Sequence, residues 1–138
     1  MSVAAETDSE RLVLRFFAVL SAGDLEGVRQ LLHAEATWKP QMRGVPGAGL
    51  HRGPSGIVDD FLAPVRALFR PGDPKIFVDT IVSRADLVMI ESHSGGSLAD
   101  GRPYENLYAW AVEVRDGKIY AVREYFDSHY VMQLTGSK

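Results

Sequence analysis

A single carboxylate near the end of the chain, Glu124, stands among aromatic and aliphatic residues. It belongs to the stretch 101–127, GRPYENLYAWAVEVRDGKIYAVREYFD, in which two β-prone runs flank Asp116-Gly117. This pattern predicts a β-hairpin. Asn106 and Tyr108 stand two positions apart on the first strand, so their side chains project from the same face. If Glu124 shares that face, the hairpin presents a proton-transfer group beside two hydrogen-bonding groups.

The geometry of the hairpin turn decides whether Glu124 is on that face. A two-residue turn would put Glu124 opposite Ala109, whereas a three-residue turn with a left-handed Gly117 and a bulge would put it opposite Tyr108. A slip of one residue reverses every side chain of one strand. Only the bulged turn leaves Glu124 as the sole charge on its face, so we predict that turn. The inner face then holds Tyr104, Asn106, Tyr108, Trp110, Val112, Tyr120, Val122, Glu124 and Phe126. The outer face holds Glu105, Leu107, Ala109, Ala111, Glu113, Ile119, Ala121, Arg123, Tyr125 and Asp127.

A carboxylate on an apolar face that helices cover is poorly solvated, and desolvation raises its pKa. Such a group exchanges protons near neutral pH, as a general acid or base does. We therefore interpret Glu124 as a candidate catalytic residue, with Asn106 and Tyr108 placed to hold an oxygen of a substrate. The predicted wall of the pocket consists of Trp38, Trp110, Phe126 and Phe17. The alternative is a structural role, in which a Tyr hydroxyl satisfies a buried Glu.

Glu91 and His93 are two further candidates for acid–base chemistry. They stand two positions apart on an otherwise apolar strand, so they project to one face. If that face is the interior, they join Glu124 as a catalytic set; at an open rim they would be solvated instead. Glu91, His93, Asp127 and His129 have the side chains of metal ligands, but their spacing matches no recognised motif. We expect neither a metal nor a cofactor.

The composition points to one globular domain. The chain has 138 residues, a formal net charge of −3 and a pI near 5.8, so it lacks the basic footprint of a nucleic-acid-binding protein. No apolar run approaches the ~20 residues of a membrane span. No Cys is present, which excludes disulfides and thiol nucleophiles. We predict a single domain over 1–138 with an ordered core of about 8–134, a cytoplasmic location, and no nucleic-acid or membrane partner.

Helical signals come first along the chain and strand signals follow. Apolar residues recur at helical spacing in three segments, and β-branched and aromatic residues dominate after Pro74. Pro64 should kink the third helix, since it removes a backbone hydrogen bond. The loop 40–54 is long enough to suggest a function of its own. The predicted helices cover about 8–21, 25–33 and 54–70, with a last helical turn at 127–134; the predicted strands cover 37–38, 76–83, 87–93, 104–114 and 119–126. A sheet with helices on one face is an α+β architecture.

The order of these elements and the hairpin sequence resemble the SnoaL-like branch of the superfamily that includes nuclear transport factor 2 and ketosteroid isomerase. The residues that carry the resemblance are Phe16-Phe17, Ala22-Gly23-Asp24, the helix start at 53–61, Gly101-Arg102, Asp116-Gly117-Lys118-Ile119 and Glu124-Tyr125-Phe126-Asp127. The resemblance implies a conical α+β barrel in which three N-terminal helices pack on a strongly bent, mostly antiparallel sheet around a deep pocket. It also implies a homodimer. The outer face has a patch of apolar, mostly small residues that would let a second sheet pack closely: Leu107, Ala109, Ala111 and Ala121.

The resemblance carries over to single residues only in part. Glu124 falls where related cyclases, phenazine-biosynthesis proteins and limonene-epoxide-hydrolase-like enzymes carry a catalytic carboxylate. The epoxide hydrolases add an Arg and an Asp on the preceding strand, and here Glu91 and His93 fall at those places, so the Arg is missing. Ketosteroid isomerases place a base Asp after the second helix, where this chain has Thr37-Trp38-Lys39.

Together these features predict a cofactor-free acid–base enzyme of the isomerase, cyclase or hydrolase type. Its expected substrate is a hydrophobic cyclic or polyketide-like small molecule. The alternative is a non-catalytic pocket protein that binds a small apolar ligand or a partner.

Overall fold

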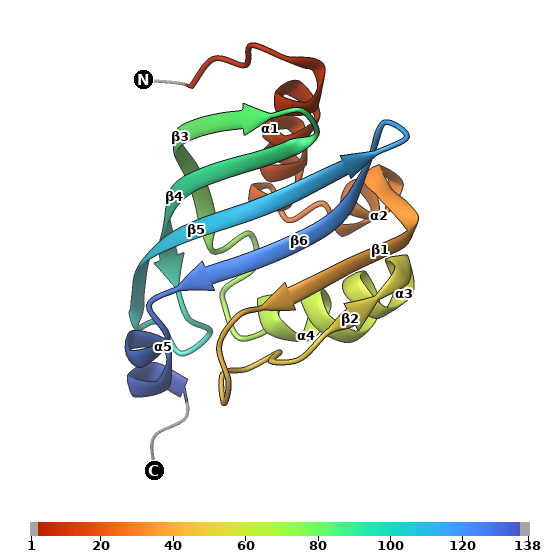
Figure 1. The fold of residues 1–138 in the computed structure, drawn as a ribbon. Helices are drawn as coiled ribbons and strands as arrows, with labels where there is room; N and C mark the ends of the chain where they lie inside the picture. Colours follow the sequence, from red (N-terminus) through yellow and green to blue (C-terminus); the bar gives the residue numbers. More distant parts are fainter. Residues whose placement is uncertain (1–2, 136–138) are drawn as a thin grey trace.

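The computed structural model describes residues 3–135 and shows helices packed against one side of a strongly bent sheet (Figure 1). The predicted α+β class is confirmed, with the three N-terminal helical segments in place. The elements are α1 (Asp8–Ser21), α2 (Leu25–Leu31), β1 (Leu32–Pro40), β2 (His51–Arg52), α3 (Gly53–Ile57), the π-helical turn η1 (Val58–Leu62), α4 (Ala63–Arg66), β3 (Lys75–Arg84), β4 (Leu87–Ser97), β5 (Pro103–Arg115), β6 (Lys118–Phe126) and α5 (Ser128–Thr135). None of the helices in this part of the chain is long and apolar enough to cross a membrane.

The sheet has six strands in the order β2-β1-β6-β5-β4-β3 and is not closed into a barrel. All neighbours are antiparallel except β1 and β6, which are parallel. The sequence indicated only a two-residue strand at Thr37-Trp38, whereas β1 runs from Leu32 to Pro40. Its pairing with β6, far away in sequence, explains the difference, because that partner leaves no local signal. The predicted strands also lack β2, which pairs with β1 at the edge of the sheet.

The first two helices begin at residues that cap helices well: Thr7, which has the spacing of a capping box with Glu10, and Asp24. The hydroxyl of Thr7 accepts a hydrogen bond from the backbone N–H of Glu10 at 3.0 Å, and Asp24 caps α2 through the N–H of Gly27 at 2.9 Å. The Glu10 carboxylate reaches back to the N–H of Glu6 and not to that of Thr7, so the reciprocal capping box is incomplete. The caps fix the entry of α1, whose apolar face then packs against the sheet.

Pro64 interrupts the third helix without ending it. The π-helical turn η1 lies immediately before α4, which has Pro64 in its first turn. Proline removes one backbone donor and its ring crowds the preceding turn, and a π-helical turn widens the helix at that place. The predicted kink is therefore a π-helical insertion between α3 and α4. This composite helix covers one end of the concave side of the sheet, beside β1 and β2 (Figure 1).

The predicted turn of the β5–β6 hairpin is wrong, although the predicted face of Glu124 is correct. Asp116 and Gly117 both have positive φ angles, 54° and 69°, as in a two-residue type I′ turn. The bulge lies instead in β6 at Tyr120, because Val114 pairs with Ile119 whereas Glu113 pairs with Ala121. This shift pairs Glu124 with Trp110 and returns the carboxylate to the inner face. Ile119 lies before the bulge, and the two-residue turn alone directs it into the core, where it is fully buried, although it was assigned to the outer face.

Candidate active site

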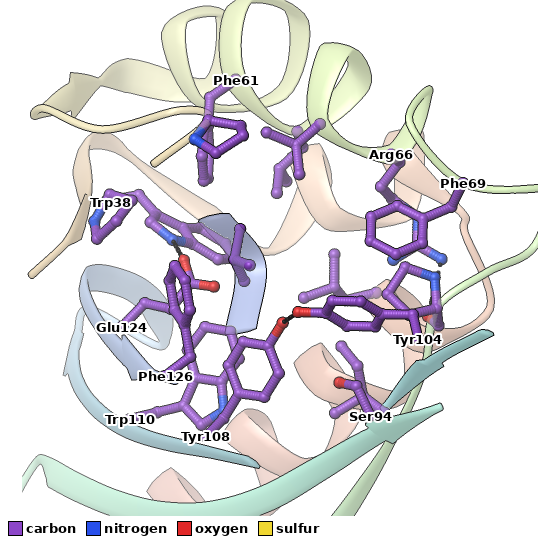
Figure 2. A pocket seen from close by; sticks show the side chains of 18 residues that line it. Trp38, Phe61, Arg66, Phe69, Ser94, Tyr104, Tyr108, Trp110, Glu124 and Phe126 are labelled. Atoms are coloured by element: carbon purple, nitrogen blue, oxygen red, sulfur yellow. Dashed lines mark hydrogen bonds between the residues drawn. The ribbon is translucent and has the colours of Figure 1, made fainter. Parts of the chain in front are cut away.

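A pocket lies between the concave face of the sheet and the composite helix α3–α4 (Figure 2). The pocket and its mouth contain about 690 Å³ of space that protein atoms do not fill. Its lining is largely apolar, with a few polar groups. The lining residues are Leu20, Trp38, Pro40, Pro46, Phe61, Leu62, Val65, Arg66, Phe69, Pro74, Ile76, Ser94, Tyr104, Tyr108, Trp110, Glu124, Phe126 and Val131. An apolar concave site with few polar groups is typical of small-molecule binding.

Glu124 points into this pocket from β6 (Figure 2). One carboxylate oxygen, Oε1, accepts a hydrogen bond from the indole Nε1–H of Trp38 at 2.9 Å. Burial raises the pKa of Glu124 from 4.5 to about 7, and the Trp38 hydrogen bond opposes that rise. Both protonation states of this carboxyl group are therefore populated at neutral pH, which is the condition for proton transfer in either direction.

Trp38 is held in place by the sheet and by other rings. The parallel pairing of β1 with β6 sets Trp38 beside Val122, next to the position of Glu124. Its ring packs against Phe16 at 5.8 Å, Phe61 at 5.5 Å and Trp110 at 5.8 Å between centroids. Such edge and tilted contacts leave the indole little freedom. The Trp38 donor thus fixes Oε1 of Glu124 and leaves Oε2 available to a ligand.

Tyr104 and Tyr108 line the same pocket as Glu124, and hydrogen bonds join them to Asn106 behind its wall. The Nδ2 of Asn106 lies 2.9 Å from the hydroxyl of Tyr104, which lies 2.7 Å from the hydroxyl of Tyr108. The amide orientation of Asn106 is fixed, because its Oδ1 accepts from the N–H of Leu107 at 2.8 Å. Tyr104 accepts from Asn106, and the two phenol hydroxyls share one hydrogen bond in which either can be the donor. When Tyr104 donates, the hydroxyl proton of Tyr108 points away from Tyr104.

Both phenols remain protonated at neutral pH. Burial raises the pKa of Tyr108 well above its ordinary value, and the negative charges of an ionised Tyr104 and of Glu124 add to the rise. Burial likewise raises the pKa of Tyr104. When Tyr108 accepts the hydrogen bond from Tyr104, its own O–H becomes a stronger donor. The pocket therefore combines a carboxyl group of raised pKa with two protonated phenol hydroxyls.

Comparison with known proteins identifies the family of this chain. The family model of the SnoaL-like domain matches residues 13–122. The chain belongs to the SnoaL-like domain family. No curated protein matches it in sequence. This SnoaL-like protein is therefore compared below with solved structures, where likeness extends over almost the whole chain.

Three solved structures show the same fold at low identity. TerC co-crystallised with polyporic acid is 20% identical over 92% of this chain and 99% of its own, with a TM-score of 0.79. A putative isomerase from Bacillus subtilis is 21% identical over 94% of both chains, with a TM-score of 0.80. A putative SnoaL-like polyketide cyclase from Jannaschia sp. CCS1 is 16% identical over 100% of this chain and 98% of its own, with a TM-score of 0.79. At these identities the likeness establishes the fold alone.

Two of the expected pocket residues lie behind its wall. Asn106 is buried but does not line the pocket; it contacts Tyr104 and the backbone oxygen of Asp127 instead. Phe17 is 1% exposed and packs edge-on against Trp110 at 4.8 Å, so it supports the wall from the core. The remaining predicted wall residues do line the pocket; they are Trp38, Tyr108, Trp110 and Phe126.

Glu91 and His93 do not join Glu124, so the expectation of a shared catalytic set is corrected. They lie opposite Ala109 and Leu107 on the outer face of the sheet and are exposed there. His93 pairs with Asp79 through Nδ1 at 2.8 Å. Side chains alternate along a strand, so the inward residues of β4 are Ser92 and Ser94. In the described part of the chain, no group of three or more His, Asp or Glu residues is placed to hold a metal ion.

Several pocket residues were missed at the level of sequence. Tyr104 was assigned to the inner face without a role, and Arg66 and Phe69 reach the pocket from α4 and the segment after it. The long loop contributes Pro46 to the lining, and Gly47 lets it lie close to the helix. A Cβ at Gly47 would stand 2.5 Å from the ring of Phe61, and its φ of +80° also favours glycine. Alternation along β5 is the one signal that could have singled out Tyr104.

Proposed function

We propose that this protein is a cofactor-free acid–base enzyme that moves a proton on a small hydrophobic molecule. Glu124 is the general base and later the general acid, and Tyr108 donates a hydrogen bond to the substrate oxygen. Tyr104 and Asn106 are positioning residues, because they act through Tyr108. The walls of the pocket favour a cyclic or polyketide-like substrate with one or two rings.

The reaction begins when Glu124 removes a proton from a carbon next to a carbonyl group. The electron pair of the broken C–H bond forms a C=C bond, and the carbonyl oxygen takes the negative charge as an enolate. The O–H of Tyr108 stabilises that charge as it develops. Where a C=C bond is conjugated with the enolate, Glu124 then returns the proton to the far carbon of the dienolate, which isomerises the substrate. Alternatively, the enolate carbon attacks a second carbonyl to close a ring, and the oxygen of that carbonyl takes the proton from Glu124.

The observation that carries this proposal is the pairing of Glu124 with Tyr108 in one apolar pocket. The pKa of Glu124, raised to about 7 by burial, suits a base at neutral pH. The hydroxyl of Tyr108 is protonated, and we assign Tyr104 as the donor in the hydrogen bond between them, which frees the Tyr108 proton for the substrate. The names of structural neighbours, an isomerase and a polyketide cyclase, agree with chemistry of this class.

Direct titration of Glu124 tests the proposal. We expect its carboxyl carbon, followed by NMR in protein with labelled Glu, to titrate with a midpoint near pH 7 because burial penalises the charged form. The spectrum of the Glu124→Gln variant assigns the signal, and Glu35, which is exposed on β1, serves as an internal reference. A midpoint for Glu124 close to its ordinary value of 4.5 would contradict the base assignment and favour a non-catalytic binding pocket.

We also propose a homodimer that covers the outer face of β3–β6. The predicted small-residue patch is partly wrong, because Ala111 is only 4% exposed. Larger apolar side chains are exposed there instead, and they form what we call the outer apolar face: Phe77, Val82, Met89, Leu107 and Tyr125. Exposed apolar patches of this kind mark interaction surfaces. The family resemblance favours a second copy of the chain as the partner.

Gel filtration with light scattering tests the dimer. We expect the native protein to elute at twice the mass of the chain and the Leu107→Glu variant to elute as a monomer, because Leu107 is 72% exposed on this face. Leu50→Glu is the matched control, since Leu50 is 45% exposed in the loop between β1 and β2. A native monomer at about 100 μM would contradict the dimer, since stable homodimers bind more tightly.

A further inference from the structure

Only two residues that line the pocket carry formal charges, and the charges are opposite. Glu124 lies beside Trp38 on one side, and Arg66 lies with Phe69 on the other side (Figure 2). The two groups do not form an ion pair, since no oxygen of Glu124 lies within 4.0 Å of a nitrogen of Arg66 among the ion pairs of residues 3–135. The pocket is therefore polarised from end to end.

Arg66 uses little of its hydrogen-bonding capacity within the protein. A guanidinium group has five N–H donors. The hydrogen bond found for Arg66 in the described residues runs from Nη2 to the backbone oxygen of Pro74 at 3.2 Å. Asp73 is the nearest acidic influence, but it makes no ion pair with Arg66, and its Oδ2 accepts from the N–H of Ser97 at 3.0 Å. The other Arg66 donors make no hydrogen bond within residues 3–135, and Arg66 is one of the residues that line the pocket.

The surroundings of Arg66 make its charge costly to leave unpaired. The residue is partly buried, and burial lowers the pKa of Arg66, an effect that the charge of Asp73 opposes. An arginine nevertheless stays protonated in proteins, so it cannot relieve the cost by losing a proton. A planar guanidinium group matches a carboxylate with two parallel hydrogen bonds. An incoming carboxylate would supply the partner that this end of the pocket lacks.

We infer that Arg66 binds a carboxylate of the ligand, so that the natural ligand is a small cyclic carboxylic acid held with its ring between Arg66 and Glu124. This inference rests on the proposed function only in taking the pocket as the ligand site; it does not require Glu124 to act as a base. The orientation follows from charge: the carboxylate lies at Arg66, and the far side of the ring lies at Glu124 and Tyr108. Arg66 is thereby a specificity-determining residue.

Calorimetric binding of two probes of equal shape tests this inference. We expect cyclohexanecarboxylate to bind the native protein at least about 10-fold more tightly than cyclohexanecarboxamide at pH 7, because hydrogen bonds to charged groups are the stronger ones. Arg66→Gln should weaken carboxylate binding by about 10- to 100-fold and change carboxamide binding by less than about 3-fold. Arg70→Gln is the control, because Arg70 is exposed and does not line the pocket.

Two further variants separate the possible outcomes. Arg66→Lys keeps the charge and should retain part of the preference for the carboxylate. Glu124→Gln should retain all of it, so a failure of the proposed proton transfer leaves this result intact. Equal affinity of the native protein for both probes, or binding of neither, would overturn the inference. A loss of both affinities by the same factor in Arg66→Gln would overturn it too, because it would show that Arg66 only anchors Pro74.

Discussion

Replacing Glu124 with Gln should slow proton abstraction in the pocket by about 10²- to 10⁴-fold, the usual contribution of a general base. Gln has nearly the shape of Glu and can still accept the hydrogen bond from Trp38 that fixes Oε1. It has no basic oxygen, so the variant removes the chemistry and keeps the packing. Tyr108, on the other side of the substrate, would still donate its hydrogen bond, and ligand affinity should change little.

A small heteroaromatic probe allows this rate to be measured without the natural substrate. When a base removes the C3 proton of 5-nitrobenzisoxazole, the N–O bond breaks and a coloured cyanophenolate forms. We expect the native protein to catalyse this ring opening with a rate that rises with pH around a midpoint near 7, because the ionised carboxylate is the base. The phenolate oxygen that forms needs a hydrogen-bond donor, and Tyr108 is placed to supply one.

The control for this experiment is Glu35→Gln, which makes the same change at an exposed position of β1. It should leave both the rate and the pH profile as in the native protein. Equal rates for the native protein and Glu124→Gln would refute the assignment of the base. A slow Glu124→Gln variant with an unchanged midpoint would show that another group titrates near pH 7.

The sequence of the hairpin was enough to identify Glu124 as the central residue of the site, but not to predict the turn and the bulge that orient it. Charge distribution between the two faces was enough to place Glu124 inward. The turn was wrong, because a two-residue turn combined with a bulge in β6 produces the same inward face as a bulged turn. The turn and the bulge each shift the register by one residue, and a total shift of two residues restores the predicted face of Glu124. Ile119 lies before the bulge, so only the turn shifts it and its predicted face is wrong.

Residues that reach the site through long-range pairing were harder to predict. Trp38 was expected only as a wall, because its hydrogen bond to Glu124 depends on the parallel pairing of β1 with β6. Arg66 follows a π-helical turn, so a regular helical pattern does not reveal where its side chain points. Alternation on β4 fixed Glu91 and His93 to one face but could not say which face was inside.

Glu124→Gln should also stabilise the fold, by an amount that grows as pH rises from about 4.5 to about 7. The pKa of Glu124 is about 7 in the folded protein and near 4.5 when it is exposed, so the folded state holds this proton more tightly than the unfolded state. The contribution of Glu124 to stability is therefore greatest below pH 4.5 and falls as pH rises through about 7. Above that pH the difference amounts to up to about 3 kcal/mol. Gln stays neutral and does not incur this loss.

Urea unfolding at about pH 4 and about pH 8.5 measures the effect as a double difference, in which the titration of all other groups cancels. We expect Glu124→Gln and the native protein to have similar free energies of unfolding at the lower pH. At the higher pH the variant should be more stable by up to about 3 kcal/mol, whereas Glu35→Gln should show no pH-dependent difference. The same offset at both pH values would mean that burial does not penalise the charge of Glu124. A gain in stability at the position where activity is lost is expected of a catalytic group. Burial of a proton acceptor raises its pKa, which suits proton transfer, but it lowers the free energy of unfolding when the group is ionised.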